Sequence, residues 1–267
     1  MKRPAKKHRL TEILVSLACF AVIAILVWQL PAFRLGEIKI SQLRTVSQEQ
    51  VIAASGLMTG QHLFAGLGGS LNQISQLRYG EVEKLLIAKF PTFKSVTAQM
   101  EFPGRIIFDI TERIEIAYLE IPDGCVMIDK EGVAMNILPQ PPADIPVIAG
   151  ITVTSLNLGQ PLSVDVASAL NSAITLMGAI IDADKDDRTE QKLLPQISRI
   201  LPVGGREIYL TVILPNTGEE LNVAAETGSE QGEDMLWLRF ALAQGVFDSR
   251  GKGVLDLTGT RKTFTPD

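Results

Sequence analysis

An acidic run from Asp182 to Asp187 carries the residue type expected of a calcium site, because carboxylate oxygens are ligands of calcium. Its alternating spacing begins like the calcium loop of helix–loop–helix proteins, which also requires Gly at the sixth position and Glu at the twelfth. The sixth residue here is Asp187 and the twelfth is Leu193. The run therefore predicts a solvated acidic loop within the charged stretch 181–191, and we expect no metal site.

A second candidate is the glycine-rich segment Gly66-Leu-Gly68-Gly69, followed by Ser70. A phosphate-binding loop would need a Lys-Ser or Lys-Thr pair and a preceding strand, and a nucleophilic serine would need the strand–turn–helix elbow. Neither pattern is present, and the two histidines, His8 and His62, are not placed to activate the hydroxyl. The stretch 65–78 is therefore interpreted as a flexible insertion.

The pair Glu112-Arg113 could act as an acid and a base, and Glu112 with Glu115 could form a carboxylate pair. At the end of a strand, a structural ion pair or a contact at a domain junction is the more usual role of Glu112-Arg113. Two carboxylates on a surface strand are more often solvated than catalytic. We therefore expect no catalytic residue, no cofactor and no enzyme activity.

Charge argues against a nucleic-acid partner. The 267 residues include 30 acidic and 25 basic side chains, and five of the basic ones lie among the first nine residues. The remainder is acidic, whereas nucleic-acid binding requires a basic patch. Cys19 lies in an apolar run and Cys125 lies far outside it, so no intramolecular disulfide is expected.

The elements that must position any site begin with an apolar run from Ile13 to Leu30, interrupted by only two polar residues. As a helix it would be about 27 Å long, close to the roughly 30 Å of a bilayer core. The cations before it and Trp28 near its end predict a membrane anchor with residues 1–12 in the cytoplasm. A cleaved signal peptide is the alternative, although its apolar region is usually about 7–15 residues long. A buried core helix fits poorly behind five cations.

The next part of the chain predicts the order strand, helix, helix, strand, strand. A strand is expected at 34–41, and a helix follows from Ser47, where Ser and Gln three residues apart form a capping-box pattern. A second helix is expected from Leu77 to Phe90. Two further strands, at 93–101 and 105–113, flank a turn.

The rest of the chain is rich in strands. Strands are expected at 117–121, 126–128, 133–137, 197–201, 207–213 and 220–224, helices at 164–180 and 233–244, and a closing strand–turn–strand from Lys252 to Thr265. The turn signal Asn216-Thr-Gly218 predicts that its two flanking strands pair as a hairpin. The chain is therefore predicted to have an α+β fold.

Short motifs punctuate these elements in a fixed order. In the first part they are Ile38 with Ile40, Val46-Ser47, Gly60-x-x-Leu63-Phe64, Phe90-Pro91, Phe102-Pro103 and Glu112-Arg113 before Ala117. Further on they are Ile128-Asp129-Lys-Glu-Gly132, Ile145-Pro146-x-x-x-Gly150 and Val254-Leu-Asp256-Leu257. In order, spacing and position behind one anchor, the pattern resembles the bacterial division protein family FtsQ/DivIB, whose first extracytoplasmic domain is a POTRA domain.

The resemblance implies a POTRA domain at about 34–113 and a strand-rich domain at about 114–265, behind a membrane helix at 13–30. It implies a non-enzymatic scaffold that recruits division proteins of the FtsB/DivIC and FtsL types and supports septal peptidoglycan synthesis. Such a protein crosses the bacterial plasma membrane once, has most of its chain outside the cytoplasm, and is concentrated at the division septum.

The last strand is the candidate binding surface, because an unpaired sheet edge can accept a strand from another chain. The family places its coiled-coil partner on the final strands. Carried over by position, this surface comprises Leu255, Asp256, Leu257, Thr260, Arg261, Lys262, Thr263 and Phe264. The alternative is an ordinary closing strand with a frayed tail.

Two other functions remain as alternatives. POTRA modules also occur in transport and assembly components of the cell envelope, but such proteins carry several POTRA repeats and a membrane barrel. A membrane-anchored enzyme acting on the cell wall would need a nucleophile or a carboxylate pair in a cleft. Neither set of features is visible in the sequence.

Overall fold

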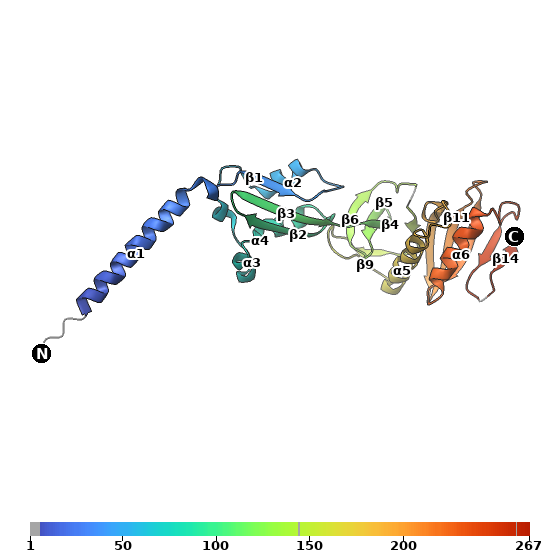
Figure 1. Ribbon diagram of the computed structural model, residues 1–267. Coiled ribbons are helices and arrows are strands. Elements are labelled where there is room, and N and C mark those ends of the chain that lie inside the picture. The colour runs from blue at the N-terminus through green and yellow to red at the C-terminus, as the bar shows by residue number, and fades with distance from the viewer. Residues whose placement is uncertain (1–5, 144, 260) are drawn as a thin grey trace. The chain divides into compact units, whose positions relative to one another are not determined.

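The computed structural model describes residues 6–143, 145–259 and 261–267. The chain divides into two compact units, with the boundary between Glu112 and Arg113. Figure 1 shows the helices and strands that make up these units. Each unit has its own hydrophobic core.

Unit 1 begins with a long apolar helix, α1 (Lys6–Gln29). Its segment Glu12–Gln29 has a mean hydropathy of 2.2, none of it is buried, and it is long enough to cross a bilayer. Leu30 follows the helix, and the short 3₁₀ turn η1 (Pro31–Phe33) begins at the proline. The structure therefore confirms one long apolar helix at the expected place.

The rest of unit 1 has the expected strand, helix, helix, strand and strand in order, with one short additional helix, α3 (Leu71–Ser75), between the two predicted helices. The elements are β1 (Glu37–Ile40), α2 (Gln48–Ser55), α4 (Gly80–Lys89), β2 (Phe93–Glu101) and β3 (Arg105–Glu112). The sheet has the order β1-β3-β2, with β1 parallel and β2 antiparallel to β3. The buried faces of these elements form one apolar core, which is the arrangement expected of a POTRA-type module.

Helix α2 starts and ends as its sequence predicts. The Ser47 hydroxyl accepts the Gln50 N–H at 3.3 Å, and the Gln50 side chain accepts the Ser47 N–H at 3.0 Å. This capping box satisfies two N–H groups that a helix start leaves without partners. Gly56 ends the helix at φ 68°, a left-handed conformation that glycine adopts without a Cβ clash.

The second helix was predicted from Leu77, but α4 begins at Gly80. Leu77 has φ 56°, and its carbonyl accepts the Met100 N–H at 2.9 Å. Tyr79 N–H donates to the Ala98 carbonyl at 2.9 Å. Residues 77–79 therefore pair with the outer edge of β2, and this pairing overrides the helical pattern of their side chains.

The glycine-rich stretch 65–78 was interpreted as flexible, and the structure instead shows it folded and anchored. It contains the end of the 3₁₀ turn η2 (Leu63–Gly66) and a short helix, α3 (Leu71–Ser75), whose start has its own capping box. The buried Glu83 carboxylate accepts two hydrogen bonds from Arg78, at 2.9 and 2.7 Å. This ion pair attaches the segment to α4. Its glycine content therefore did not indicate that the segment is flexible.

Unit 2 contains a nine-stranded sheet in the order β14-β13-β12-β11-β10-β7-β4-β5-β6. Its strands are β4 (Glu115–Ile121), β5 (Gly124–Asp129), β6 (Ala134–Leu138), β7 (Val147–Ile148), β10 (Ile197–Gly204), β11 (Glu207–Ile213), β12 (Glu220–Glu226), β13 (Gly253–Asp256) and β14 (Thr263–Pro266). A separate pair, β8 (Val153–Ser155) and β9 (Ser163–Val164), and the 3₁₀ turn η3 (Leu194–Gln196) complete it. The predicted hairpin of β11 and β12 is confirmed.

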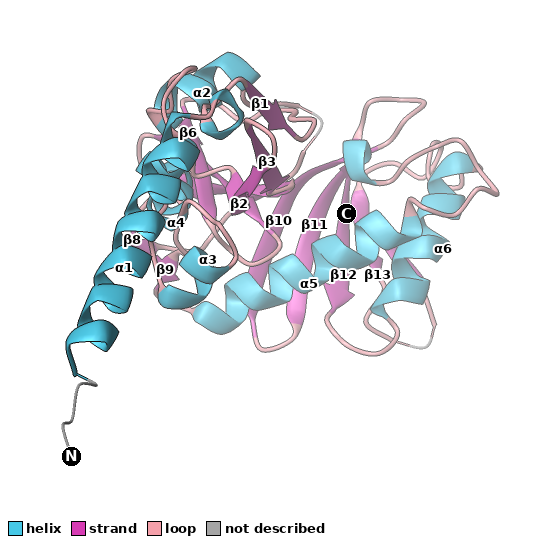
Figure 2. Ribbon diagram, turned by 60° about the vertical axis from the view of Figure 1, so that its left-hand side comes forward, coloured by secondary structure: helices cyan, strands magenta, loops and turns pink. Residues whose placement is uncertain are grey.

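Two helices, α5 (Ala167–Ala183) and α6 (Gln231–Ala243), cover one face of the sheet (Figure 2). Their apolar side chains and the facing strand residues form the larger core of the protein. The strand-rich α+β architecture is therefore as predicted.

The sequence did not predict β7, yet this two-residue strand joins the two halves of the sheet. Val147 and Ile148 pair in parallel with both β4 and β10. Ile148 is fully buried, and the Pro146 carbonyl accepts the Tyr118 N–H at 3.2 Å. The motif around Pro146 and Gly150 therefore has a structural role, which is to complete the sheet.

Candidate partner-binding edge

The predicted binding residues lie at the end of the unit 2 sheet where β14 is the last strand of the order. β14 is antiparallel to β13, with Leu255 opposite Phe264 and Asp256 opposite Thr263. β13 is parallel to β12, and α6 forms the connection between them. This edge of the sheet is therefore a β-α-β unit with one added antiparallel strand.

The outward-facing backbone of β14 follows from its pairing. Asp267 N–H donates to the Lys252 carbonyl at 3.1 Å, so alternate residues of the strand turn their backbone groups toward β13. Phe264 and Pro266 then turn theirs away from it. Phe264 offers one donor and one acceptor, whereas Pro266 offers a carbonyl and no donor. The edge can thus add a strand, but only in a restricted register.

The apolar residues of the predicted set attach the edge strand to the core. Leu255 and Leu257 are buried. Phe264 is half-buried, with its ring centroid 6.2 Å from that of Phe247 and 5.8 Å from the Arg250 guanidinium carbon. The side chains of Leu255, Leu257 and Phe264 therefore pack against the core of unit 2 and hold the edge strands in place.

The loop between β13 and β14 is held by ionic contacts. The Lys262 ammonium donates to the Asp234 carboxylate and, at 3.3 Å, to the Leu257 carbonyl. Asp256 accepts hydrogen bonds from the Thr258 hydroxyl at 2.7 Å and from its N–H at 2.8 Å. These bonds, with the nearby Lys262 charge, hold the pKa of Asp256 below its ordinary value of 3.8.

Of the remaining predicted residues, Arg261 and Thr263 are exposed. Thr260 lies outside the residues that the structure describes. The side chains available to a partner along β14 are therefore those of Arg261, Thr263 and Thr265, together with the backbone of Phe264.

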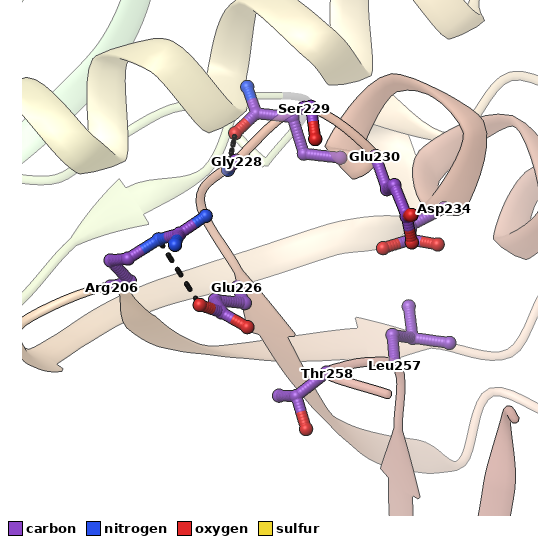
Figure 3. Close-up of a pocket in the computed structure, with 9 residues that line it drawn as sticks. Arg206, Glu226, Gly228, Ser229, Glu230, Asp234, Leu257 and Thr258 are labelled. Atoms are coloured by element: carbon purple, nitrogen blue, oxygen red, sulfur yellow. Dashed lines mark hydrogen bonds and ion pairs between the residues drawn. The ribbon is translucent and has the colours of Figure 1, made fainter. Parts of the chain in front are cut away.

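A polar pocket of about 220 Å³ lies beside this edge (Figure 3). It is lined by the β10–β11 turn, the end of β12, the loop before α6, the first turn of that helix and the residues after β13. The lining residues are Arg206, Glu226, Gly228, Ser229, Glu230, Gln231, Asp234, Leu257 and Thr258. Arg206 and Glu226 form an ion pair at 3.1 Å. Glu226 is paired with Arg206 and Asp234 with Lys262, so the pocket is polar and its charges are largely balanced within the chain.

This pocket was not predicted from the sequence, although the strand pattern contained a signal. Two parallel strands joined by a helix place their carboxyl ends beside the start of that helix, where open sheets commonly form a crevice. Recognising β12 and β13 as parallel neighbours would have required knowing the tertiary pairing.

Glu112 and Arg113 bind different partners. Glu112 accepts the N–H groups of Arg44 at 2.6 Å and Thr45 at 3.0 Å. Burial alone would raise the pKa of Glu112, but the bonds from the Thr45 hydroxyl and these two N–H groups lower it. Arg113 donates to the buried Asp129 carboxylate at 2.6 Å. Each residue thus makes a structural contact inside its own unit.

The acidic stretch after α5 is more ordered than a solvated loop. The side chain of Arg239 in α6 is fully buried and donates to the carbonyls of Ala183 at 2.6 Å, Asp186 at 2.8 Å and Gln191 at 2.6 Å, and also to that of Thr189. Asp186 faces Arg188, whose guanidinium lowers the pKa of Asp186 to about 2. Among the described residues, no cluster of His, Cys, Asp and Glu could hold a metal ion.

No protein-family model matches the chain. The chain is, however, similar to curated proteins. The cell division protein FtsQ of Corynebacterium glutamicum is 26% identical over 130 residues, and the match covers 49% of this chain and 53% of the relative's length. FtsQ of Mycobacterium leprae is 26% identical over 137 residues, covering 51% and 36%. FtsQ of Mycolicibacterium smegmatis is 24% identical over 213 residues, covering 72% and 60%. The matches thus span between about a third and three fifths of these relatives.

Among solved structures, the chain is similar to the major extracytoplasmic domain of the trans isomer of the bacterial cell division protein DivIB from Geobacillus stearothermophilus. It covers 52% of this chain and 98% of its own, with 17% identity and a TM-score of 0.31. The fold assignment follows from the strand order given above and not from this superposition.

Proposed function

Because the chain belongs to the FtsQ/DivIB family of bacterial cell-division proteins, we propose that it is a non-enzymatic scaffold of the division machinery. It recruits coiled-coil partners of the FtsB/DivIC and FtsL types and so supports septal peptidoglycan synthesis. In this proposal the POTRA domain occupies 34–113 and the second domain 114–265. The two compact units of the chain support this division.

The observation that carries the proposal is the outer edge of β14. The strand is last in the sheet order, and its Phe264 backbone turns a donor and an acceptor away from β13. Backbone hydrogen bonds give affinity in strand addition, and side chains beside the edge give specificity. Leu255 and Leu257 keep the edge in place from the core.

The polar pocket adds a means of discrimination. Its polar groups come from the end of β12, the start of α6 and Thr258 after β13, beside the loop that leads to β14. A partner strand that carries a polar side chain past the edge would find hydrogen-bonding groups in the pocket, whereas an apolar side chain would not.

The membrane helix defines the topology of the proposed scaffold. Helix α1 crosses the plasma membrane once, the basic residues at its start stay in the cytoplasm, and the rest of unit 1 and all of unit 2 lie outside. The protein is concentrated at the septum, where its partners assemble. Depletion in the native bacterium should therefore block septation, and normal septation after depletion would exclude the proposal.

A backbone variant tests the edge directly. Phe264→Pro removes the outward N–H of β14, whereas Phe264→Leu keeps that donor and replaces only the ring. We expect Phe264→Pro to weaken binding of the outer segment of the FtsB-type partner by roughly tenfold or more in calorimetric titration, and Phe264→Leu to weaken it less. Equal affinities for Phe264→Pro and the unmodified protein, with both folded by circular dichroism, would exclude the β14 edge.

A further inference from the structure

Five aromatic side chains gather where the membrane helix meets the folded part of unit 1. The Trp28 and His62 rings stack with centroids 3.9 Å apart. Phe33 lies 5.8 Å from Phe64 and 5.2 Å, edge to face, from Phe102. His62 and Phe64 are 5.5 Å apart. We call Trp28, Phe33, His62, Phe64 and Phe102 the membrane-proximal cluster.

Backbone hydrogen bonds hold the cluster against the end of the helix. Leu35 N–H donates to the Gln61 carbonyl at 2.8 Å, which places the loop of His62 beside the residues that leave α1. Gly36 N–H donates to the Gly104 carbonyl at 2.7 Å, which brings the β2–β3 turn to the same place. Two motifs noted in the sequence, Gly60 to Phe64 and Phe102-Pro103, therefore meet at this point.

Part of the cluster is exposed, while Phe33, His62 and Phe64 are half-buried. Trp28 is 57% exposed and Phe102 is 44% exposed, although both rings pack on neighbours. Leu30, which follows the helix between Trp28 and Phe33, is also exposed. An apolar surface of this kind, left open beside an apolar helix of membrane-spanning length, requires an occupant.

The position of the cluster identifies that occupant. The apolar segment of α1 ends at Gln29, so Trp28 lies where the hydrocarbon core gives way to lipid headgroups. The headgroup layer on each side is about 5–8 Å thick. Phe33 follows Gln29 by only a few residues in the chain, and its ring contacts that of Phe102. Aromatic rings favour this layer, and the exposed Arg34 beside them suits lipid phosphates.

We propose that the membrane-proximal cluster is a lipid-binding surface, with the rings of Trp28, Phe33 and Phe102 seated in the headgroup layer. The POTRA-type module then rests on the bilayer and is not suspended from a free tether. This inference rests on the membrane topology in the proposed function, but it does not depend on any division partner.

Fluorescence of single-tryptophan variants tests the proposal in the full chain, reconstituted in phosphatidylglycerol–phosphatidylethanolamine vesicles. The reporter is Phe102→Trp in a background with Trp28→Phe and Trp237→Phe. Its matched control is Leu85→Trp in the same background, because Leu85 is 49% exposed on α4 and outside the cluster. Native Trp28, with Trp237→Phe, reports whether α1 is inserted. Phe33→Trp is a second reporter if Phe102→Trp fails to fold.

We expect lipids with a headgroup nitroxide to quench the Phe102→Trp reporter and native Trp28 several-fold more than the Leu85→Trp control, and aqueous iodide to quench the control more. If Trp28 is quenched by lipid but the Phe102→Trp reporter behaves like the control, the lipid-binding surface is refuted while the membrane helix stands. If the reporter is shielded from both quenchers, protein covers the cluster and the lipid assignment is also refuted. If no reporter is quenched by lipid, the membrane topology itself fails.

Discussion

Arg113 and Asp129 form a nearly buried ion pair at the start of unit 2, with 2.6 Å between Nη1 and Oδ2. The other carboxylate oxygen of Asp129 accepts the N–H groups of Glu131 at 2.8 Å and Val133 at 2.9 Å. Two short motifs that lie apart in the sequence, Glu112-Arg113 and Ile128 to Gly132, are thus connected by one carboxylate. This contact fixes the β5–β6 turn onto the first residue of the unit.

Removing Arg113 should leave the Asp129 carboxylate buried without its cation. The two side chains are only 11% and 4% exposed, so we expect Arg113→Ala to lower the free energy of unfolding of unit 2 by about 3 kcal/mol. Urea denaturation measures this change. The control is Arg199→Ala, whose pair with Glu120 is 52% and 53% exposed and should contribute less than about 1 kcal/mol. If Arg113→Ala and Arg199→Ala lowered the free energy of unfolding equally, burial would not determine the contribution of the ion pair.

Arg239 should govern the order of the acidic stretch after α5. A lysine has no planar fork and cannot reach four carbonyls together, so Arg239→Lys should destabilise unit 2 by about 3 kcal/mol and speed proteolysis within 184–192. Arg188→Lys, in the same stretch but exposed, should cost less than about 1 kcal/mol. An unchanged cleavage rate in Arg239→Lys would contradict the role assigned to the guanidinium.

The loop before β14 should weaken in acid. The folded-state pKa of Asp256 is below its ordinary value of 3.8, so its stabilising effect is fully present above that value and is lost as the pH falls through the lowered pKa. Asp256→Asn should therefore reduce the melting temperature at neutral pH, and this difference should shrink below pH 3.8. A difference that is constant from neutral pH into this acid range would mean that the carboxylate charge is not involved.

Gly104 should tolerate alanine less well than a glycine of similar conformation. Gly104 has φ 66°, and a Cβ there would lie 2.9 Å from the Arg34 carbonyl oxygen. Gly205 has φ 61°, but a Cβ there would meet nothing within 4 Å. The left-handed conformation costs either alanine about 1–2 kcal/mol, and only Gly104→Ala adds a clash. We expect a lower melting temperature for Gly104→Ala, and equal values would exclude the clash.

Hydrophobic pattern and turn chemistry predicted the elements whose signals are local. The run that became α1, the capping box of α2, the strands β2 and β3, and the hairpin of β11 and β12 all follow from neighbouring residues. Their order was sufficient to recognise the POTRA-type module. The binding surface assigned to β14 remains a prediction.

What the sequence could not predict depends on contacts between distant segments. Residues 77–79 have a helical pattern but pair with β2, and β7 is a strand only because β4 and β10 lie on either side of it. Arg239 looks like an ordinary polar residue of a surface helix, yet it is buried by a loop about 50 residues earlier in the chain. The polar pocket likewise exists only once β12 and β13 are side by side.

The two-residue strand β7 also gives the large sheet a mechanical weak line. Strands β14 to β10 form one block and β4 to β6 another, and in the described structure the backbone ladder between these blocks runs through the short segment 146–149, which contains β7. Under tension, a ladder this short would yield before the longer pairings within either block. A force applied to the β14 edge would therefore break the backbone hydrogen bonds of β7 first. The sheet would separate there into its two blocks, while the strand pairings within each block stayed intact.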